Sequence, residues 1–291
     1  MKLIGIGDNV VDRYINKRIM FPGGNAVNFA VYAHECGEDS AYLGFIADEA
    51  EGWLIYNTLK EIGVDVSQSQ PIKGLTTERC DVTLIDGDRT FIGCEYGEGE
   101  WKPLRLNSEH LEYLRGFDLI HCGCYAEMED EIAKLDDLGK LAADARGPVK
   151  TYDFSSEEEY RTDEYLRKVC PHIDIALFSQ EEMTDEQALE LQKKVHELGT
   201  ELVLVTNGSK GQKLWDGRRL YQGKVKMVDA VDTMGAGDSF FTAFAVQMLR
   251  EGYRRGRVPD ENSIQKAFEY AANFSAKVCM MDGAFGYGTK Y

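Results

Sequence analysis

Short apolar segments alternate with amphipathic segments along most of the chain, and this alternation limits the possible folds more than any other feature. Strand-like runs of apolar residues lie at 3–6, 41–46, 118–121, 149–154, 173–178 and 202–206. Apolar residues at helical spacing lie at 25–36, 51–62, 129–145, 157–169, 186–198, 236–251 and 263–281. This order predicts an α/β fold, a three-layer sandwich whose mainly parallel central sheet carries helices on both faces.

Residues 76–94 interrupt the alternation. Two strand-like runs, 79–85 and 89–92, flank the polar turn Asp86-Gly87-Asp88, a pattern typical of a β-hairpin. We predict that it belongs to a small β lid with strands from about 10–20 and 75–97. A two-stranded hairpin is unstable alone, so we expect it to pack on its own chain or on a partner. A second hairpin is expected around Asp216-Gly217, and the whole of 1–291 is predicted to form one domain.

Composition and charge exclude several functional classes. A formal net charge of -17 argues against general nucleic-acid binding, which requires a basic face. No apolar run is long enough to span a membrane, and the first eight residues are too short for a secretory signal. We therefore predict a cytoplasmic protein with no membrane or nucleic-acid partner.

The seven cysteines are an odd number without a paired framework, so we expect buried free thiols in a reducing cytosol.

The segment Asp232-Thr-Met-Gly-Ala-Gly-Asp-Ser-Phe240 is the sharpest chemical signal. A loop with two glycines runs into a helix start, whose N–H groups form a natural site for phosphate charge. An Asp at position 238 is placed to accept a proton from an attacking hydroxyl. The alternative is a plain helix cap. Phe240 stands where a dinucleotide fingerprint needs its third glycine, which disfavours an oxidoreductase, and 208–213 lacks the ending of a P-loop.

Two segments together resemble one family. Residues 232–240 closely resemble the C-terminal signature of the ribokinase-like (PfkB) carbohydrate kinases, and Gly23-Gly-Asn-Ala-Val-Asn-Phe-Ala30 resembles their N-terminal signature. The resemblance covers essentially the whole chain, and the hairpin falls where the family keeps its substrate lid. It implies a ribokinase-like fold and an ATP-dependent sugar kinase that uses Mg²⁺. It leaves open whether a monovalent cation binds near Asp232.

The resemblance also implies roles for individual residues. Asp238 matches the catalytic base, and Gly235, Ala236 and Gly237 match a backbone anion hole. The positions that match sugar-binding groups are Asn9, Asp12, Gly24, Asn25, Asn28 and Tyr96. The positions that match the nucleotide site are Thr206, Gly208, Gly211 and Asn273. Glu182 matches a carboxylate that helps to organise magnesium through water, although Ser179 stands where the family usually carries Asn.

Finer similarity points to an acceptor. The segments 6–12, 21–28, 96–99 and 282–286 resemble the fructoselysine 6-kinase branch of the family. This implies phosphorylation of the 6-hydroxyl of fructoselysine or a related fructosamine, and the lid acids Glu95, Glu98 and Glu100 would favour an ammonium group. The alternatives are a kinase for another sugar or a nucleoside (fructose, ribose, 2-keto-3-deoxygluconate) and a catalytically silent sugar-binding regulator. Because lids of this family often pair between subunits, a homodimer through the lid is expected.

Overall fold

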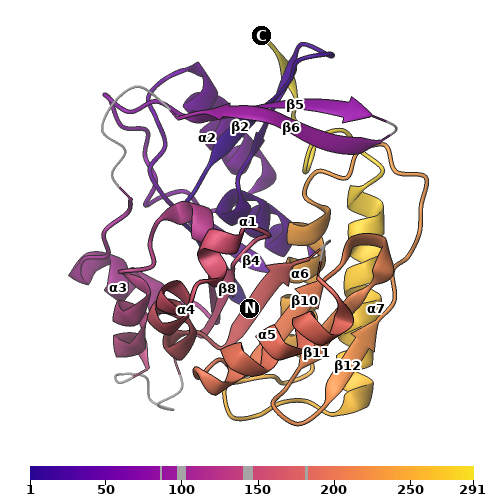
Figure 1. Ribbon diagram of the computed structural model, residues 1–291. Coiled ribbons are helices and arrows are strands. Elements are labelled where there is room, and N and C mark those ends of the chain that lie inside the picture. The colour runs from indigo at the N-terminus through magenta and orange to yellow at the C-terminus, as the bar shows by residue number, and fades with distance from the viewer. Residues whose placement is uncertain (86, 97–102, 140–146, 181–182) are drawn as a thin grey trace.

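A computed structural model describes residues 1–85, 87–96, 103–139, 147–180 and 183–291. Two sheets organise the chain (Figure 1). The larger sheet has the strand order β12-β11-β10-β9-β8-β7-β1-β4. Its parallel strands are β1 (Lys2–Ile6), β4 (Asp39–Leu43), β7 (Leu119–Gly123), β8 (Val149–Asp153), β9 (Ile175–Ser179) and β10 (Leu202–Thr206). The hairpin β11 (Gln212–Trp215) and β12 (Leu220–Gly223) extends it in antiparallel fashion.

Helices cover both faces of this sheet, as predicted. One core joins the sheet to α1 (Asn25–Glu35), α6 (Ala236–Arg250) and α7 (Glu261–Val278). The other joins it to α3 (Ser108–Leu114), α4 (Asp163–Val169) and α5 (Asp185–Glu197). Successive residues of a strand enter opposite cores: Ile175 and Leu177 enter the first, Ala176 and Phe178 the second. Burial on both faces explains why these strands are continuous apolar runs.

The helix predicted at 129–145 is wrong in its described part. Ile132–Leu138 forms a 3₁₀ helix, η2, and residues 140–146 lie outside the described residues. Its buried side chains, Ile132, Leu135 and Leu138, recur at every third position, which is the period of a 3₁₀ helix rather than of an α-helix. The other 3₁₀ segments are η1 (Cys124–Ala126), η3 (Glu158–Arg161), η4 (Cys170–His172) and η5 (Gly208–Lys210).

The smaller sheet forms the predicted lid. Its strand order is β13-β3-β2-β5-β6, with β13 (Thr289–Lys290), β3 (Ile19–Gly23), β2 (Val10–Tyr14), β5 (Glu78–Ile85) and β6 (Asp88–Glu95). It lies across one end of the molecule (Figure 1). A third core joins Val11, Tyr14 and Val82 of this sheet to α1 and to α2 (Ala50–Ile62). The lid is therefore packed on its own chain.

The lid also contacts the loop that leads into α6. The Tyr14 hydroxyl donates to Asp232 Oδ2 at 2.6 Å, and the Thr233 N–H donates to the Gly87 carbonyl at 3.2 Å. A Cβ at Gly87 would lie 2.4 Å from the Ala230 carbonyl oxygen, so only glycine allows this approach. Arg89 Nη1 donates to the Thr233 carbonyl at 3.0 Å. These contacts hold the lid closed over the start of α6.

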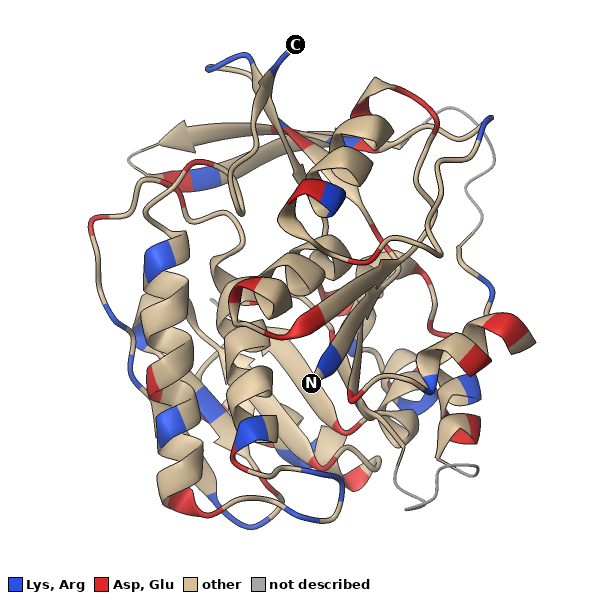
Figure 2. Cartoon of the chain, turned by 180° about the vertical axis from the view of Figure 1, so that it is seen from behind, with Lys and Arg blue, Asp and Glu red and all other residues tan. Residues whose placement is uncertain are grey.

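Charged residues of both signs are spread over the elements (Figure 2). In the part of the chain that the structure describes, no helix is both long enough and apolar enough to cross a membrane.

The prediction that all seven cysteines are free thiols is wrong for two of them. Cys80 and Cys94 form a disulfide between β5 and β6, whereas the other five are free and buried. The hairpin register explains the pairing, because a register shift between Asp81 and Val82 sets Cys80 directly opposite Cys94. Glu78 has a carboxylate oxygen within 4.8 Å of both sulfurs. Sulfur atoms bonded to each other are not thiolates, so this group is not a metal site in the oxidised chain.

Counting thiols tests this disulfide. We expect five reactive thiols in the denatured, unreduced protein and seven after reduction. Because the bond closes a short loop in the unfolded chain, Cys94→Ser should lower the free energy of unfolding by about 3 kcal/mol. Seven thiols without reductant, or an unchanged free energy of unfolding, would contradict the bond.

Candidate functional site

Two helices begin side by side beneath the lid, and glycine makes each start possible. Gly24 precedes α1 with φ 110°, and a Cβ there would lie 2.7 Å from Asn9 Cα. Gly235 precedes α6 with φ 72°, and a Cβ there would lie 2.2 Å from the Tyr32 hydroxyl oxygen. Neither the backbone conformation nor the space admits a side chain. The two starts bring Asn25 and Asn28 to Asp238.

Asp238 is held by two amide donors. Asn25 Nδ2 donates to its Oδ1 at 3.0 Å, and Asn28 Nδ2 donates to its Oδ2 at 2.6 Å. Burial raises the pKa of Asp238, whereas the two amide donors and the charge of Arg89 lower it. The amides thus favour the charged form and fix the carboxylate in one orientation. This arrangement suits a general base.

Asn25 is the centre of a wider network. Its Nδ2 also donates to Asp153 Oδ2 at 2.9 Å, and its Oδ1 lies 2.9 Å from His121 Nε2. Because carboxylates only accept hydrogen bonds, the NH₂ group of Asn25 must face Asp153 and Asp238. The amide oxygen Oδ1 then faces His121 and accepts from it. Burial lowers the pKa of His121 to about 3, so the ring is neutral with its proton on Nε2. His121 Nδ1 then accepts from the Thr151 hydroxyl at 2.9 Å.

Two of the carboxylates near Asn25, Asp8 and Asp153, were not predicted from the sequence. Asp8 follows β1 and accepts from the backbone N–H groups of Asn25 at 2.6 Å and Ala26 at 3.2 Å. Burial raises the pKa of Asp8 to about 6 and that of Asp153 to about 8. The sequence could have indicated both residues, because each lies at the carboxyl end of a predicted strand. Ligands of parallel α/β sheets bind at the carboxyl ends of the strands.

The lid contributes Asp12. Its side chain is 4% exposed, and burial raises its pKa to about 7. The positive charge of Arg89 lowers this pKa, whereas the negative charges of Asp232, Asp238 and Glu78 raise it further. A Cβ at Gly23 would lie 2.8 Å from Asp12 Oδ2, so this carboxylate lies against the glycine turn that leads into α1. Arg89, which lies on the lid and bonds to Thr233, was also missed by the sequence reasoning.

The remaining predicted sugar-binding residues are arranged differently. Both amide hydrogens of Asn9 are engaged within the protein, by the Tyr42 hydroxyl at 2.8 Å and the Phe45 carbonyl at 2.6 Å. Tyr96, just after β6, is 80% exposed. The structure therefore brings Asp12, Gly24, Asn25 and Asn28 together around Asp238, and leaves Tyr96 at the surface.

The start of α6 has backbone donors to offer. Its helical ladder begins with Ser239 N–H donating to the Gly235 carbonyl at 2.8 Å, and Ala236 N–H donates to the Thr233 carbonyl at 3.1 Å. Gly237 and Asp238 lie between them, among the first N–H groups that a helix leaves without an internal acceptor. A Cβ at Gly237 would meet no atom within 4 Å. An anion therefore has both space and donors here.

Asp232 has a structural contact at every oxygen. Its Oδ1 accepts from the Met234 N–H at 2.9 Å, and its Oδ2 accepts from the Tyr14 hydroxyl at 2.6 Å and the Gly283 N–H at 2.8 Å. It thereby joins the lid, the loop before α6 and the C-terminal segment.

The predicted nucleotide residues lie farther along the sheet. Thr206 ends β10, Gly208 begins η5, and Gly211 follows it, with Asn207 N–H donating to the Gly211 carbonyl at 2.9 Å. Asn273, on α7, accepts from Lys226 Nζ at 2.7 Å. A cavity of about 290 Å³ adjoins this loop, and its lining includes Asn207, Lys210, Gly211, Thr184 and Val205. Ser179 ends β9, and Glu182 lies outside the described residues.

Comparison with known proteins agrees with this geometry. The family model described as "pfkB family carbohydrate kinase" matches residues 3–285. The chain is 34% identical to fructosamine kinase FrlD of Bacillus subtilis (strain 168), over 100% of this chain and 95% of that protein. It is 33% identical to fructoselysine 6-kinase of Escherichia coli (strain K12), over 83% and 87% respectively.

Solved structures show the same fold. A ribokinase from Giardia lamblia aligns with a TM-score of 0.79 at 18% identity, and covers 98% of this chain and 95% of its own. An Arabidopsis thaliana ribokinase, solved with ribose and ATP, aligns with a TM-score of 0.76 at 21% identity and the same coverage. The fold is therefore ribokinase-like, as the sequence predicted.

The Asn28 contact gives a pH prediction. Asn28→Ala removes a donor that favours charged Asp238, so the pKa of Asp238 should rise and the acid limb of kcat/KM should move to higher pH. A hydrogen bond to a charge contributes about 1.5–3 kcal/mol, which corresponds to roughly one to two pH units. Steady-state kinetics across pH with any accepted sugar measure it.

The exposed Asn262, at the start of α7, offers a matched control. Asn262→Ala should leave the acid limb where it is. An unmoved limb in Asn28→Ala would show that this contact does not tune the group on which activity depends.

Proposed function

The chain belongs to the pfkB family of carbohydrate kinases, and we propose that it transfers the γ-phosphoryl group of ATP to the 6-hydroxyl of a fructosamine such as fructoselysine. The observation that carries the proposal is the Asp238 carboxylate, fixed by two amides beside the open helix start at Gly237. A base and an anion site in contact are what phosphoryl transfer to an alcohol requires.

The proposed chemistry assigns a task to each part of the site. Asp238 accepts the proton as the sugar hydroxyl attacks phosphorus, and the amides of Asn25 and Asn28 keep it charged and oriented. Backbone N–H groups at Gly237 and Asp238 receive the charge that develops on the transferred phosphoryl group. Arg89 adds a positive charge from the lid, which also excludes water from the reacting atoms.

The donor and its metal follow from the family. We infer ATP as the phosphoryl donor, with Thr206, Gly208, Gly211 and Asn273 as predicted nucleotide contacts. Mg²⁺ remains a prediction from the resemblance, which leaves open whether a monovalent cation binds near Asp232. When bound, Mg²⁺ supplies positive charge to the phosphates.

The choice of acceptor rests on two observations. Two relatives, identical at 34% and 33% of aligned residues, are named as a fructosamine kinase and a fructoselysine 6-kinase. The acceptor side of the site is also lined by Asp8, Asp12 and Asp153, whose pKa values are raised by burial and by the charge of Asp238. Such a concentration of acid suits an acceptor that carries an amine.

A homodimer through the lid is likewise proposed. β6 is an edge strand with exposed Phe91 and Ile92, and Ile85 is exposed at the end of β5. An apolar edge of this kind is a template for pairing with a second copy. Mass measurement in solution distinguishes a dimer from a monomer.

A panel of acceptors with ATP and Mg²⁺ tests the proposed activity. We expect fructoselysine to have the highest kcat/KM, above free fructose, ribose and nucleosides. Higher activity on one of those acceptors would refute the fructosamine assignment and leave a carbohydrate kinase.

Asp238→Asn tests the base. Loss of a general base should lower kcat by about 10²- to 10⁴-fold with little change in KM for ATP. Turnover near that of the wild type would exclude this role for Asp238.

A further inference from the structure

The inner face of the lid carries an ordered series of charges. Residues opposite each other on paired strands point to the same face, and β2 pairs with β5 so that Val10 faces Glu78, Asp12 faces Cys80 and Tyr14 faces Val82. Tyr14 donates to Asp232 in the main body, which identifies this face as the inner one. Glu78 therefore points inward, one pleat beyond Asp12.

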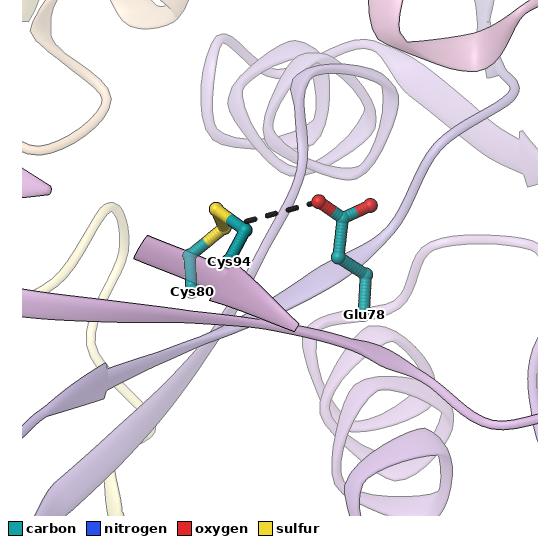
Figure 3. Close-up of side chains that lie close together, drawn as sticks. All are labelled: Glu78, Cys80 and Cys94. Carbon is teal, nitrogen blue, oxygen red and sulfur yellow. Dashed lines mark hydrogen bonds between the residues drawn. A yellow bond between two sulfur atoms is a disulfide. The ribbon is translucent and has the colours of Figure 1, made fainter. Parts of the chain in front are cut away.

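Glu78 lies in an acidic and half-buried place. One of its carboxylate oxygens is 3.9 Å from Cys80 Sγ, and the Cys80–Cys94 disulfide lies against it (Figure 3). Burial raises the pKa of Glu78 to about 7, and the negative charges of Asp8 and Glu127 add to the effect. The disulfide supplies no charge and no proton. The negative charges that act on Glu78 thus come from Asp8 on the loop after β1 and Glu127 on the loop after η1, and Glu78 in turn raises the pKa of Asp12 on β2.

Two acids of the lid, Asp81 and Glu95, have a basic partner, but Glu78 differs. Asp81 and Glu95 accept from Arg13 at 2.7 and 3.1 Å. These residues lie on the outer face, where Arg79 pairs with Glu95 across the strands. Within the described part of the chain, no Lys, Arg or His forms an ion pair with Glu78. Asp12, nearly fully buried on the same inner face, also lacks a hydrogen-bond partner among the described residues.

Charge changes sign along this face. Arg89, opposite Leu84 at the far end of β5, reaches Thr233 beside the start of α6. Asp12 lies between, coupled to both Arg89 and Glu78. Two residues along a strand span about 7 Å, a length comparable with that of a hexose. An acceptor with its reacting hydroxyl at Asp238 and its body along this face would extend from the basic end toward Glu78.

We propose that Glu78 binds the ammonium group at carbon 1 of the acceptor and is the residue that selects a fructosamine over the free ketose. This inference rests on the proposed function. A carboxylate held among other acids without a cation is costly, and an ammonium group placed there relieves that cost. A free ketose carries a neutral hydroxyl at the same position and gains no such contact.

Of the lid acids that the sequence indicated for an ammonium group, Glu95 lies on the outer face with Arg13, and Glu98 and Glu100 lie outside the described residues.

Glu78→Gln tests the proposal because it keeps the shape and removes the charge. Steady-state kinetics with fructoselysine and with free fructose should show a fall in the ratio of their kcat/KM values. A charged hydrogen bond of this kind corresponds to a fall of about 10- to 100-fold. The loss should lie mainly in KM for fructoselysine, and a thermal unfolding midpoint equal to that of the wild type shows that the variant is folded.

Glu95→Gln is the matched control, because it removes a carboxylate from the outer face of the same lid. Its ratio should equal that of the wild type. If wild-type protein prefers fructoselysine and Glu78→Gln keeps that preference, this inference is wrong while the proposed function stands. If wild-type protein does not prefer fructoselysine, the proposed function itself fails. An equal fall of both substrates in Glu78→Gln would also overturn the selective role.

Discussion

The hydrogen bonds of the Asn25 side chain are the constraint on which the site depends. One amide joins the starts of α1 and α6 to the ends of β7 and β8, through Asp238, His121 and Asp153. Because every donor and acceptor of this amide is used, its orientation is fixed, and so are the tautomer of His121 and the position of Asp238. A base on a helix start is thereby held to one geometry by partners from three other elements.

Electrostatics explain why the surrounding acids tolerate one another. Asp8, Asp12 and Asp153 all have pKa values raised toward neutrality, so part of their negative charge is neutralised by protons near pH 7. Asp238 differs because two amides and Arg89 favour its charged form. The carboxylates of the site therefore differ in role: Asp238 is suited to accept a proton, whereas Asp8, Asp12 and Asp153 line the proposed acceptor-binding side. Asp232 has a third task, since its three donors join the lid to the loop before α6.

Sequence patterns predicted the parts of this arrangement that are local. The glycine loop at 232–238 and the turn at 23–28 pointed to Asp238, Asn25 and Asn28, and strand–helix alternation predicted the layers. Asp8, Asp153 and Glu78 were missed because they join the site only through the order of the strands and the register of the lid. The disulfide was missed because a register shift between Asp81 and Val82 sets Cys80 opposite Cys94, whereas an unbroken register from the Ile85–Asp88 pair would set it opposite Gly93. The 3₁₀ segment at Ile132–Leu138 was misread because its apolar residues also fit a helical face.

The most direct test of the account is a crystal structure with an acceptor and a non-hydrolysable ATP analogue. The account predicts that the acceptor's primary hydroxyl lies within hydrogen-bond distance of Asp238, with the terminal phosphate over the N–H groups at the start of α6. A structure in which Asp238 contacts only Asn25 and Asn28, with the acceptor hydroxyl elsewhere, would contradict it.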